Sequence, residues 1–156
     1  MEEYPVEDDA LASAMAASHA IVGTAVQAMT EELPDISLPV SRALLLVARR
    51  GPQRPSDLAQ DLGVSAATAG RAVTRLARDG LVERYRDPDD GRSVLARLTG
   101  KGQAVFDAIL DRRRGAFASY LKTIPPEQQK ELGLAFQAFA EASDHAADLT
   151  WPQESP

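Results

Sequence analysis

The chain has 156 residues, of which 44% are hydrophobic and 26% are charged, as expected for a globular protein with one domain, or one small domain and an oligomerisation element. It contains no cysteine, which excludes disulfides, thiol redox sensing, thiolate metal sites and a cysteine nucleophile. No run of eighteen apolar residues predicts a membrane span, and the acidic N-terminus MEEYPVEDDALAS lacks the features of a secretory signal, so we expect a cytoplasmic protein.

The net charge of −6 conceals two oppositely charged parts. Residues 40–102 contain 12 Lys and Arg against 7 Asp and Glu, a net charge of +5, whereas the remainder contains 5 against 16, a net charge of −11. A basic part can dock on phosphate while an acidic part stays away from it. The asymmetry therefore favours a nucleic-acid partner, unless the charge simply varies along the chain without functional meaning.

The first predicted helix runs from Ala10 to Glu32 and carries an apolar stripe that one helix cannot bury by itself. Its partner is either another helix of the chain or a second copy of the chain. After a break at Pro34, the next helix begins near Ser37 and ends at Gly51-Pro52; it is apolar almost all round, which predicts a central core helix. The stripe of the first helix consists of Leu11, Met15, Ser18, Ile21, Val22, Ala25, Val26 and Met29.

Two shorter helical patterns flank a Gly63-Val64-Ser65 turn. The first begins at Pro55, and the second is capped by Ser65 and extends to Asp79. One face of the second helix is apolar and another carries guanidinium and hydroxyl groups. Such a helix suits the DNA major groove, because Arg can pair bidentately with guanine. The apolar face consists of Ala69, Ala72, Val73 and Leu76, and the polar face of Thr68, Arg71, Thr74, Arg75 and Arg78.

Residues 81–85 and 93–98 alternate as two strands of a hairpin, and the loop between them is rich in turn residues. Two strands alone are marginally stable, so they must pack on the helix-turn-helix as a wing. Two long helices follow, at about residues 100–122 and 127–149, with Thr99 as the cap of the first. The second carries an apolar stripe of Leu132, Ala135, Phe136, Phe139 and Ala142.

This order of elements resembles the MarR family of winged helix-turn-helix transcription regulators. Two segments carry the resemblance, RRGPQRPSDLAQDLGVSAAT and VTRLARDGLVERYRDPDDGRSVLARLTGKG. Within the second, Asp90-Gly91-Arg92 before a strand, then Leu98-Thr99 and Gly102, match the wing signature of the family. The match is close over residues 38–102, whereas the flanking helices match only in length and placement.

The resemblance implies a mainly α fold with a small β-hairpin, built as a winged helix-turn-helix domain and a helical dimerisation domain. The expected boundaries are 1–36 for an N-terminal dimerisation helix, 37–99 for the DNA-binding domain, 100–149 for the C-terminal dimerisation helices and 150–156 for a tail. Three departures are Gly70 within a helix, Ala66-Ala67 without polar atoms at its start, and Pro125 where a Ser cap is usual.

The resemblance further implies a homodimer that places one recognition helix per subunit in the major groove and one wing over the minor groove of a pseudo-palindromic duplex. Arg75 either contacts DNA or pairs with a wing acid such as Asp90, and Asp90 orients Arg92 or the loop. Asp87 and Asp89 are expected to face away from phosphate. The predicted DNA-binding residues are Ser65, Thr68, Arg71, Thr74, Arg75, Arg84, Arg86 and Arg92.

Further arginines have other expected roles. Arg49, Arg50 and Arg54 could touch the DNA backbone near the turn, whereas the run at residues 112–114 is expected to form ion pairs in the acidic part of the chain. The resemblance suggests a small aromatic or phenolic effector, for which His19 and Arg42 are the candidate ligand-binding residues. No cofactor and no metal site are predicted, since the two histidines do not belong to a ligand cluster.

The sequence therefore predicts a dimeric, sequence-specific DNA-binding transcription regulator, a repressor that a small ligand releases. The alternative is a winged-helix protein-interaction module that does not bind DNA, which the net acidity and Ala66-Ala67 favour. An enzyme is not expected, because no spacing places a nucleophile beside an oriented base and no phosphate loop is present.

Overall fold

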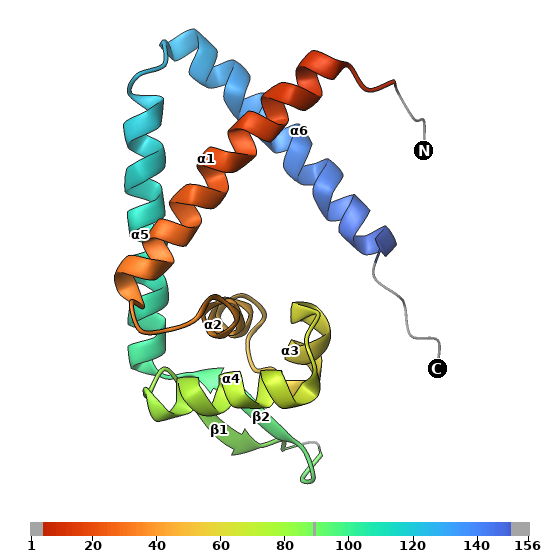
Figure 1. Cartoon of the computed structure of the whole chain (residues 1–156), viewed down its shortest axis with the longest axis vertical. Coiled ribbons are helices and arrows are strands. Elements are labelled where there is room, and N and C mark those ends of the chain that lie inside the picture. The colour runs from red at the N-terminus through yellow and green to blue at the C-terminus, as the bar shows by residue number, and fades with distance from the viewer. Residues whose placement is uncertain (1–4, 89, 151–156) are drawn as a thin grey trace. The chain divides into compact units, whose positions relative to one another are not determined.

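The computed structural model describes residues 5–88 and 90–150, the last eight of these by their backbone alone. The described chain is mainly helical with one two-stranded antiparallel hairpin (Figure 1), as the sequence predicted. It divides into two compact units, residues 1–114 and 115–156. The elements are α1 (Asp8–Glu32), α2 (Leu38–Arg50), α3 (Pro55–Leu62), α4 (Ala66–Arg78), β1 (Val82–Arg86), β2 (Val94–Leu98), α5 (Gly100–Leu121) and α6 (Pro126–Thr150).

The core of the first unit lies where α2, α3 and α4 meet. Leu44 of α2, Leu58 of α3 and Leu76 of α4 are fully buried, and burial of such a side chain stabilises the fold by about 1.5–3 kcal/mol. The apolar face predicted for α4 is buried along its whole length. This packing fixes the rotation of α4 about its own axis, so its guanidinium-bearing side is turned outward.

Local backbone signals set both ends of α4. Gly63 ends α3 with a φ of +66°, and Ser65 Oγ accepts the N–H of Thr68 at 3.2 Å, which caps α4 as predicted. At the other end Gly80, with a φ of +72°, and Leu81 return their N–H groups to carbonyls of the last helical turn. These bonds form a Schellman motif, which ends the helix after Arg78.

The wing is an antiparallel pair with Val82 opposite Leu98 and Arg86 opposite Val94. The first strand begins one residue later than predicted, because the Schellman motif of α4 uses the N–H of Leu81. Gln53, ahead of α3, exchanges two backbone hydrogen bonds with Ala96 of β2, at 2.9 and 2.8 Å. This bridge adds a third extended segment to the hairpin and supplies the packing that two strands alone would lack.

The Leu98-Thr99 and Gly102 signature joins the wing to the ends of α4 and α5. Thr99 Oγ1 donates to the carbonyl of Gly80 at 2.6 Å and accepts the N–H of Gly102 at 3.0 Å, so Thr99 caps α5 as predicted. A Cβ on Gly102 would lie 1.9 Å from the carbonyl oxygen of Leu81. This part of the signature therefore has a structural role: it fixes the close approach of α5 to the start of β1.

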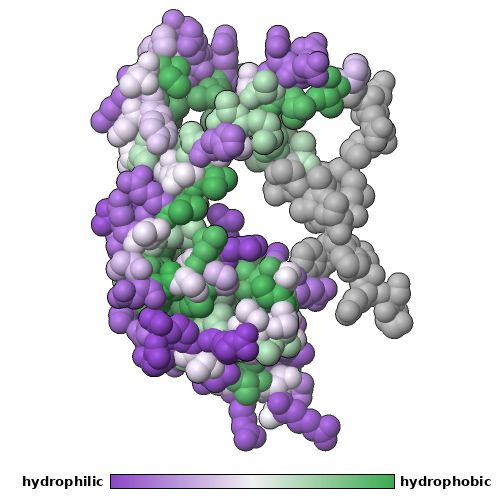
Figure 2. Space-filling view, in the orientation of Figure 1, coloured by the Kyte–Doolittle hydropathy of each residue, from purple (hydrophilic) through white to green (hydrophobic). Residues whose placement is uncertain are grey.

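Most of the apolar stripe predicted for α1 is exposed in the single chain. Leu11, Met15 and Val22 are 52%, 54% and 59% exposed, and only residues near the C-terminal end of the helix are buried. Figure 2 shows hydrophobic side chains along this helix. By length and composition α1 could also cross a membrane, although the sequence predicted no span. A helix that packs against a protein partner can have the same length and apolar composition, so these two properties are weak evidence of a membrane span.

The second unit consists of the last turns of α5 and all of α6. The side-chain amide of Gln129 donates to the carbonyls of Leu121 and Ile124, at 3.0 and 2.8 Å, and so ties the start of α6 to the end of α5. The stripe predicted for α6 has no buried member among the residues described with side chains, and Phe139 is 65% exposed. Like α1, α6 presents an apolar face that this single chain does not cover.

Candidate nucleic-acid interface

The start of α4 holds a chain of hydrogen bonds that leads to Arg71. Ser65 Oγ lies 2.9 Å from Thr68 Oγ1, which in turn accepts a hydrogen bond from Arg71 Nη2 at 2.9 Å. Arg71 is exposed, and no carboxylate lies within ion-pair distance of it among the described residues. The predicted residues Ser65, Thr68 and Arg71 are therefore brought together, and the two hydroxyl groups orient a guanidinium that keeps most of its donors free.

Thr74 lies one turn further along the same side of α4. Its hydroxyl donates to the carbonyl of Gly70 at 2.9 Å, so in this rotamer only the lone pairs of the oxygen face outward. A phosphate oxygen can only accept hydrogen bonds. Thr74 is thus arranged to accept a hydrogen bond from a base amino group or a water molecule rather than to donate to phosphate.

A shallow hollow follows the outer side of α4 and reaches β1. Four guanidinium groups line it, together with Ala67, Gly70 and Thr74. No atom of another element lies within 4 Å of a Cβ built on Gly70, so this glycine leaves the hollow open and is not required by packing within the chain. We call this surface the basic face; its guanidinium groups are those of Arg71, Arg75, Arg78 and Arg84.

Two members of the basic face are tied to protein: Arg78 pairs with Asp79 at 3.6 Å, and Arg75 is held more closely. Its Nε donates to Asp79 Oδ2 at 2.7 Å and its Nη2 donates to the backbone carbonyl of Asp35 at 3.2 Å. The carboxylate partner is therefore Asp79, not the wing residue Asp90 that the sequence offered as an alternative. The hydrogen bond from Arg75 lowers the pKa of Asp79 below its ordinary value.

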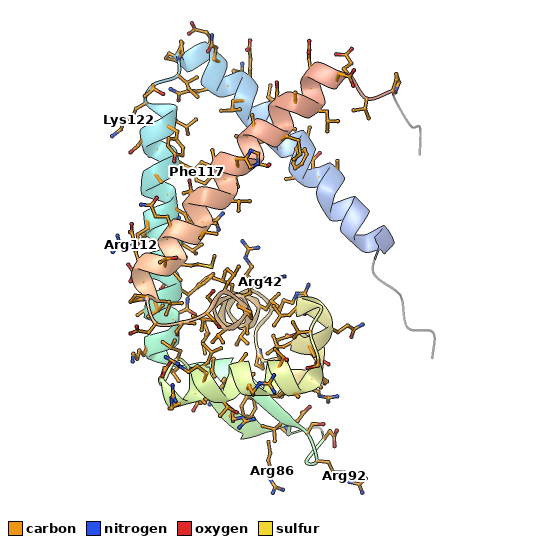
Figure 3. The ribbon with its side chains drawn as sticks, in the orientation of Figure 1. Arg42, Arg86, Arg92, Arg112, Phe117 and Lys122 are labelled. Atoms are coloured by element: carbon orange, nitrogen blue, oxygen red, sulfur yellow. The ribbon has the colours of Figure 1, made fainter. Side chains whose placement is uncertain are left out.

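Arg86 and Arg92 carry charge to the tip of the wing. Both side chains extend away from the helices (Figure 3), and neither has a carboxylate within ion-pair distance among the described residues. Arg84 of β1 is likewise exposed and faces the hollow beside α4. The three wing arginines that the sequence singled out thus remain available to an external anion.

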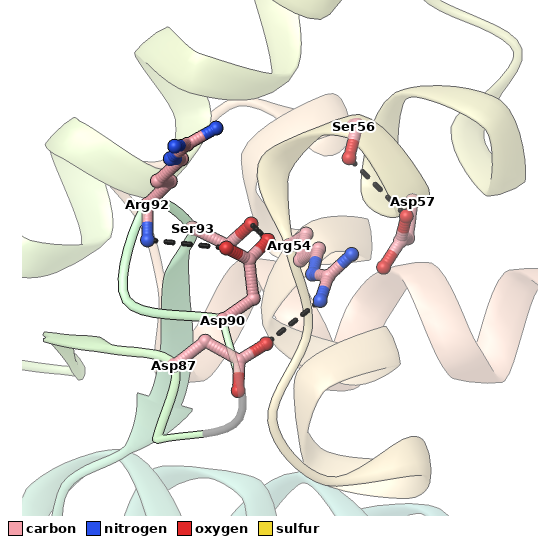
Figure 4. A network of polar contacts seen from close by, with 7 residues as sticks. All are labelled: Arg54, Ser56, Asp57, Asp87, Asp90, Arg92 and Ser93. Carbon is pink, nitrogen blue, oxygen red and sulfur yellow. Dashed lines mark hydrogen bonds and ion pairs between the residues drawn. The ribbon is translucent and has the colours of Figure 1, made fainter.

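Carboxylates inside the wing loop hold its shape. Asp90 accepts the backbone N–H of Arg92 at 3.2 Å and the hydroxyl of Ser93 at 2.6 Å (Figure 4), which confirms the orienting role predicted for it. These two bonds, with that from Ser93 the larger influence, lower the pKa of Asp90. The carboxylate is thereby kept charged and directed into the loop. Asp89 lies outside the described residues.

Asp87 fastens the wing loop to the segment ahead of α3. It is only 7% exposed, and its Oδ2 accepts a hydrogen bond from Arg54 Nη2 at 2.7 Å (Figure 4). This bond raises the pKa of Arg54. Asp87 thus points inward, in keeping with the expectation that it faces away from phosphate, whereas Arg54, proposed from the sequence as a backbone contact, holds the wing in place.

Other arginines also have protein partners that the sequence did not reveal. Arg50 pairs with Asp61 of α3, and Arg97 donates to Glu83 at 2.7 Å, directly opposite on β1, while lying 4.8 Å from the centre of the Tyr85 ring. The pairing of Arg97 could have been found from the hairpin register, because residues opposite each other on one face are close neighbours.

The predicted ion pairs of the Arg112 to Arg114 run are present at two of the three positions. Arg112 binds both Glu31 and Glu32 of α1, which raises its pKa, and Arg114 binds Asp111 at 2.8 Å. Arg113 differs, because its Nε is buried without a hydrogen-bond partner among the described residues. The Arg112 pairs fasten the C-terminal end of α1 to α5.

The structure does not bring the two candidate ligand-binding residues into one described site. His19 is exposed on α1, and Arg42 is exposed on α2, where it points away from α4 and the wing (Figure 3). A separate hollow lies between the end of α1, the end of α4 and the start of α5, and its lining includes Leu33, Ile36 and Arg75. The sequence did not identify this hollow, because residues from three separate segments of the chain form it.

Known proteins are similar to this chain in both sequence and architecture. Residues 36–94 match the model of the MarR family. An uncharacterized HTH-type transcriptional regulator of Bacillus subtilis, YfiV, is 25% identical over 112 residues, which is 72% of this chain and 70% of the relative. The crystal structure of RV1404 from Mycobacterium tuberculosis has a TM-score of 0.78 and 29% identity over 91% of this chain and 98% of that one.

A MepR variant from S. aureus bound to an oligodeoxyribonucleotide shares the fold, with a TM-score of 0.63 at 18% identity over 88% of this chain and 99% of that one. The winged helix, the wing signature and the match of residues 36–94 point to one conclusion. Over residues 36–94 the chain is similar to the MarR family, its elements form a winged helix-turn-helix, and its relative YfiV is an HTH-type transcriptional regulator.

Proposed function

We propose that the chain acts in the cytoplasm as a homodimeric, sequence-specific repressor that binds a pseudo-palindromic duplex and is released by a small aromatic or phenolic ligand. The observation that carries the proposal is a single surface with four exposed guanidinium groups that have no carboxylate partner among the described residues. These groups belong to Arg71 of α4 and to Arg84, Arg86 and Arg92 of the wing.

The two parts of this surface suit different grooves. An α-helix fits the major groove, where Arg71 can pair with guanine and the Thr74 oxygen can accept from an amino group. The wing carries Arg92 at its tip, and a narrow A·T-rich minor groove attracts guanidinium groups. Arg84 and Arg86 lie between the two and are suited to the phosphates that separate the grooves.

The dimer is supported by the apolar faces of α1 and α6. Leu11, Met15 and Val22 of α1 are each more than half exposed, as are Leu134 and Phe139 of α6. Large apolar side chains grouped in this way mark protein interfaces. Two subunits would double the contacts of one small winged helix, which by itself makes too few for selectivity in a genome.

Repression would follow from occupancy of a promoter, and release from a change in the distance between the two recognition helices. The helices must be about 34 Å apart to enter successive major grooves, so a modest change in their separation weakens both half-site contacts together. Arg42 or His19 would bind the carboxylate or phenolate of the ligand; the two lie on different helices and are candidates independently of each other.

The test is the equilibrium binding of the purified protein to duplex DNA that flanks its own gene, measured by fluorescence anisotropy at several salt concentrations. We expect affinity to fall steeply with salt, because each phosphate contact contributes about 0.9 to the slope of log K against log salt. Arg71→Ala and Arg92→Ala should each weaken binding, by about 5- to 150-fold where a base contact worth 1–3 kcal/mol is lost.

Arg114→Ala is the matched control, because Arg114 is also exposed but pairs with Asp111 on α5. It should leave the affinity unchanged. Binding that does not depend on salt, or that neither Arg71→Ala nor Arg92→Ala weakens, would refute DNA recognition by this surface and would favour the alternative of a protein-interaction module. A protein that stays monomeric in sedimentation velocity would refute the dimer.

A further inference from the structure

Like Arg78, Arg75 of the basic face borders two hollows. On one side it lines the hollow between α4 and β1, and on the other it lines the hollow formed by the end of α1, the connection to α2 and the start of α5. The side chain of Arg75 is 37% exposed, against 68% for that of Arg78, three residues further along α4. Of the two arginines between the DNA-facing side of α4 and the α1–α2 connection, Arg75 is therefore the more enclosed.

The contacts of Arg75 join three parts of the chain. Nε is bound to the carboxylate of Asp79, the last residue of the α4 cap, and Nη2 is bound to the carbonyl of Asp35, forty residues earlier. The carbonyl of Asp79 accepts in turn from Lys101 of α5 at 2.9 Å. The α1–α2 connection and α5 are thus both joined to the C-terminal end of α4, the first through the Arg75 side chain and the second through the Asp79 backbone.

The same contacts leave Arg75 poorly placed to read DNA. Guanidinium has five N–H donors in a fixed planar fork, and the Nε and Nη2 positions along one edge are already committed to protein. A bidentate contact with guanine through that edge would require both bonds to break. Arg71, which shares only one donor with the Thr68 hydroxyl, has no such constraint.

We propose that Arg75 is a positioning residue, which holds the recognition helix against the α1–α2 connection and so sets the orientation in which Arg71 and Thr68 meet DNA, without contacting DNA itself. The proposal rests on the DNA binding proposed above. It assigns the basic face two kinds of arginine, those that bind the duplex and one that fixes the helix carrying them.

A positioning role for the pair of Arg75 and Asp79 and a purely electrostatic role for the Asp79 carboxylate predict opposite effects of Asp79→Asn on DNA binding. By charge alone, removal of a carboxylate beside the basic face strengthens binding to a polyanion. If Asp79 anchors Arg75, the same substitution weakens binding, by about 2- to 30-fold as for residues that couple packed elements. Arg75→Gln should weaken binding to a similar extent. The double variant should bind about as well as Arg75→Gln alone, because the bond between Arg75 and Asp79 is then already absent and Asp79 retains only its 3.6 Å ion pair with the exposed Arg78.

The salt dependence provides the second readout. Arg71→Gln should lower the slope of log K against log salt wherever Arg71 contacts a phosphate, by about 0.9 per contact, whereas Arg75→Gln should leave the slope unchanged. Arg75→Lys should not rescue affinity, because one ammonium cannot reproduce the planar, two-partner geometry of guanidinium, although it would preserve a simple phosphate contact.

The experiment measures the full-length protein on one duplex by fluorescence anisotropy, with far-UV circular dichroism and thermal unfolding of every variant. Weaker binding by Asp79→Asn with an unchanged slope, and no rescue by Arg75→Lys, supports the proposal. Tighter binding by Asp79→Asn, a lower slope for Arg75→Gln, or full affinity with Arg75→Lys overturns it. Should Arg75→Gln not fold, Asp79→Asn and Arg75→Lys decide the question.

Failure of the function proposed above gives a different pattern. In that case the wild-type protein shows no salt-dependent binding to any duplex, and both the DNA-binding function and the positioning role of Arg75 are refuted. If wild type binds and Arg71→Gln weakens it, but Arg75 behaves as a phosphate contact, only the positioning role is overturned.

Discussion

Replacement of Gly102 by alanine is predicted to destabilise the winged helix strongly, although Gly102 lies within α5 where alanine is normally favoured. The added Cβ would lie 1.9 Å from the carbonyl oxygen of Leu81 and 2.9 Å from its carbonyl carbon. Both are backbone atoms that cannot rotate away, so α5 and the start of β1 must separate by more than 1 Å, about the difference between 1.9 Å and the shortest tolerated approach.

The magnitude follows from the contacts that this separation disturbs. Overpacking of a filled site destabilises proteins by about 1–3 kcal/mol. The carbonyl of Leu81 also accepts the N–H of Thr99 at 3.1 Å, and loss of a hydrogen bond of this kind costs about 1 kcal/mol more. We therefore expect Gly102→Ala to lower the free energy of unfolding by about 2–4 kcal/mol, from these two effects together.

The assay is urea unfolding followed by far-UV circular dichroism at fixed protein concentration, since a dimer links stability to concentration. Gly70→Ala is the matched control: it makes the same change in a helix, but the added Cβ meets no atom within 4 Å. It should raise stability by up to about 1 kcal/mol through helix propensity. Equal effects of the two substitutions, or a neutral Gly102→Ala, would refute the reasoning.

Three further predictions concern the wing and the apolar helices. Arg54→Ala should increase hydrogen exchange of the wing amides and weaken DNA binding, because Asp87 then loses the bond that fastens the loop; unchanged exchange would contradict this. Ser93→Ala should raise the pKa of Asp90 in an NMR titration, since the hydrogen bond from the Ser93 hydroxyl is the largest cause of its lowered pKa. Because the pKa of Asp90 is lower in the folded protein, its contribution to stability is present above the unfolded pKa and is lost as pH falls through the folded pKa. An unchanged pKa of Asp90 in the variant would count against the Ser93 bond. Phe139→Asp should convert the proposed dimer to monomer in sedimentation velocity, whereas Gln128→Asp near the start of the same helix should not; a dimeric Phe139→Asp protein would exclude this face from the interface.

The helix-turn-helix could be predicted closely because its boundaries depend on neighbouring residues. Pro55, Gly63, Ser65 and Gly80 each act on the backbone within a few positions, and the structure places the ends of α3 and α4 at these residues. The apolar face of α4 follows equally directly from the helical period. Such signals require no knowledge of the tertiary structure.

The partners of the arginines could not be predicted in this way. Arg54 and Asp87 are 33 positions apart, and only the packing of the wing against the segment ahead of α3 brings them together. Arg75 and Asp35 are 40 apart and meet only because α4 packs against the α1–α2 connection. From the sequence each of these arginines carries the same charge as Arg71 or Arg92. Tertiary structure alone separates the guanidinium groups that bind protein from those that face outward.

The apolar helices show a related limit. The period of α1 and α6 correctly identified which side of each helix is apolar, but it carries no information about what covers that side. The structure leaves Met15, Val22 and Phe139 exposed in the single chain. A second copy of the chain is the occupant that we propose, and the sedimentation experiments test it.

Hydroxyl-radical footprinting on DNA that flanks the gene of this protein tests the central claim most directly, since it reports position, spacing and symmetry together. If two copies of α4 enter successive major grooves, two protected tracts will appear on one face of the duplex with centres about 10 base pairs apart, each flanked by minor-groove protection from a wing. A single tract, or no protection at concentrations where the protein is dimeric, would contradict the account.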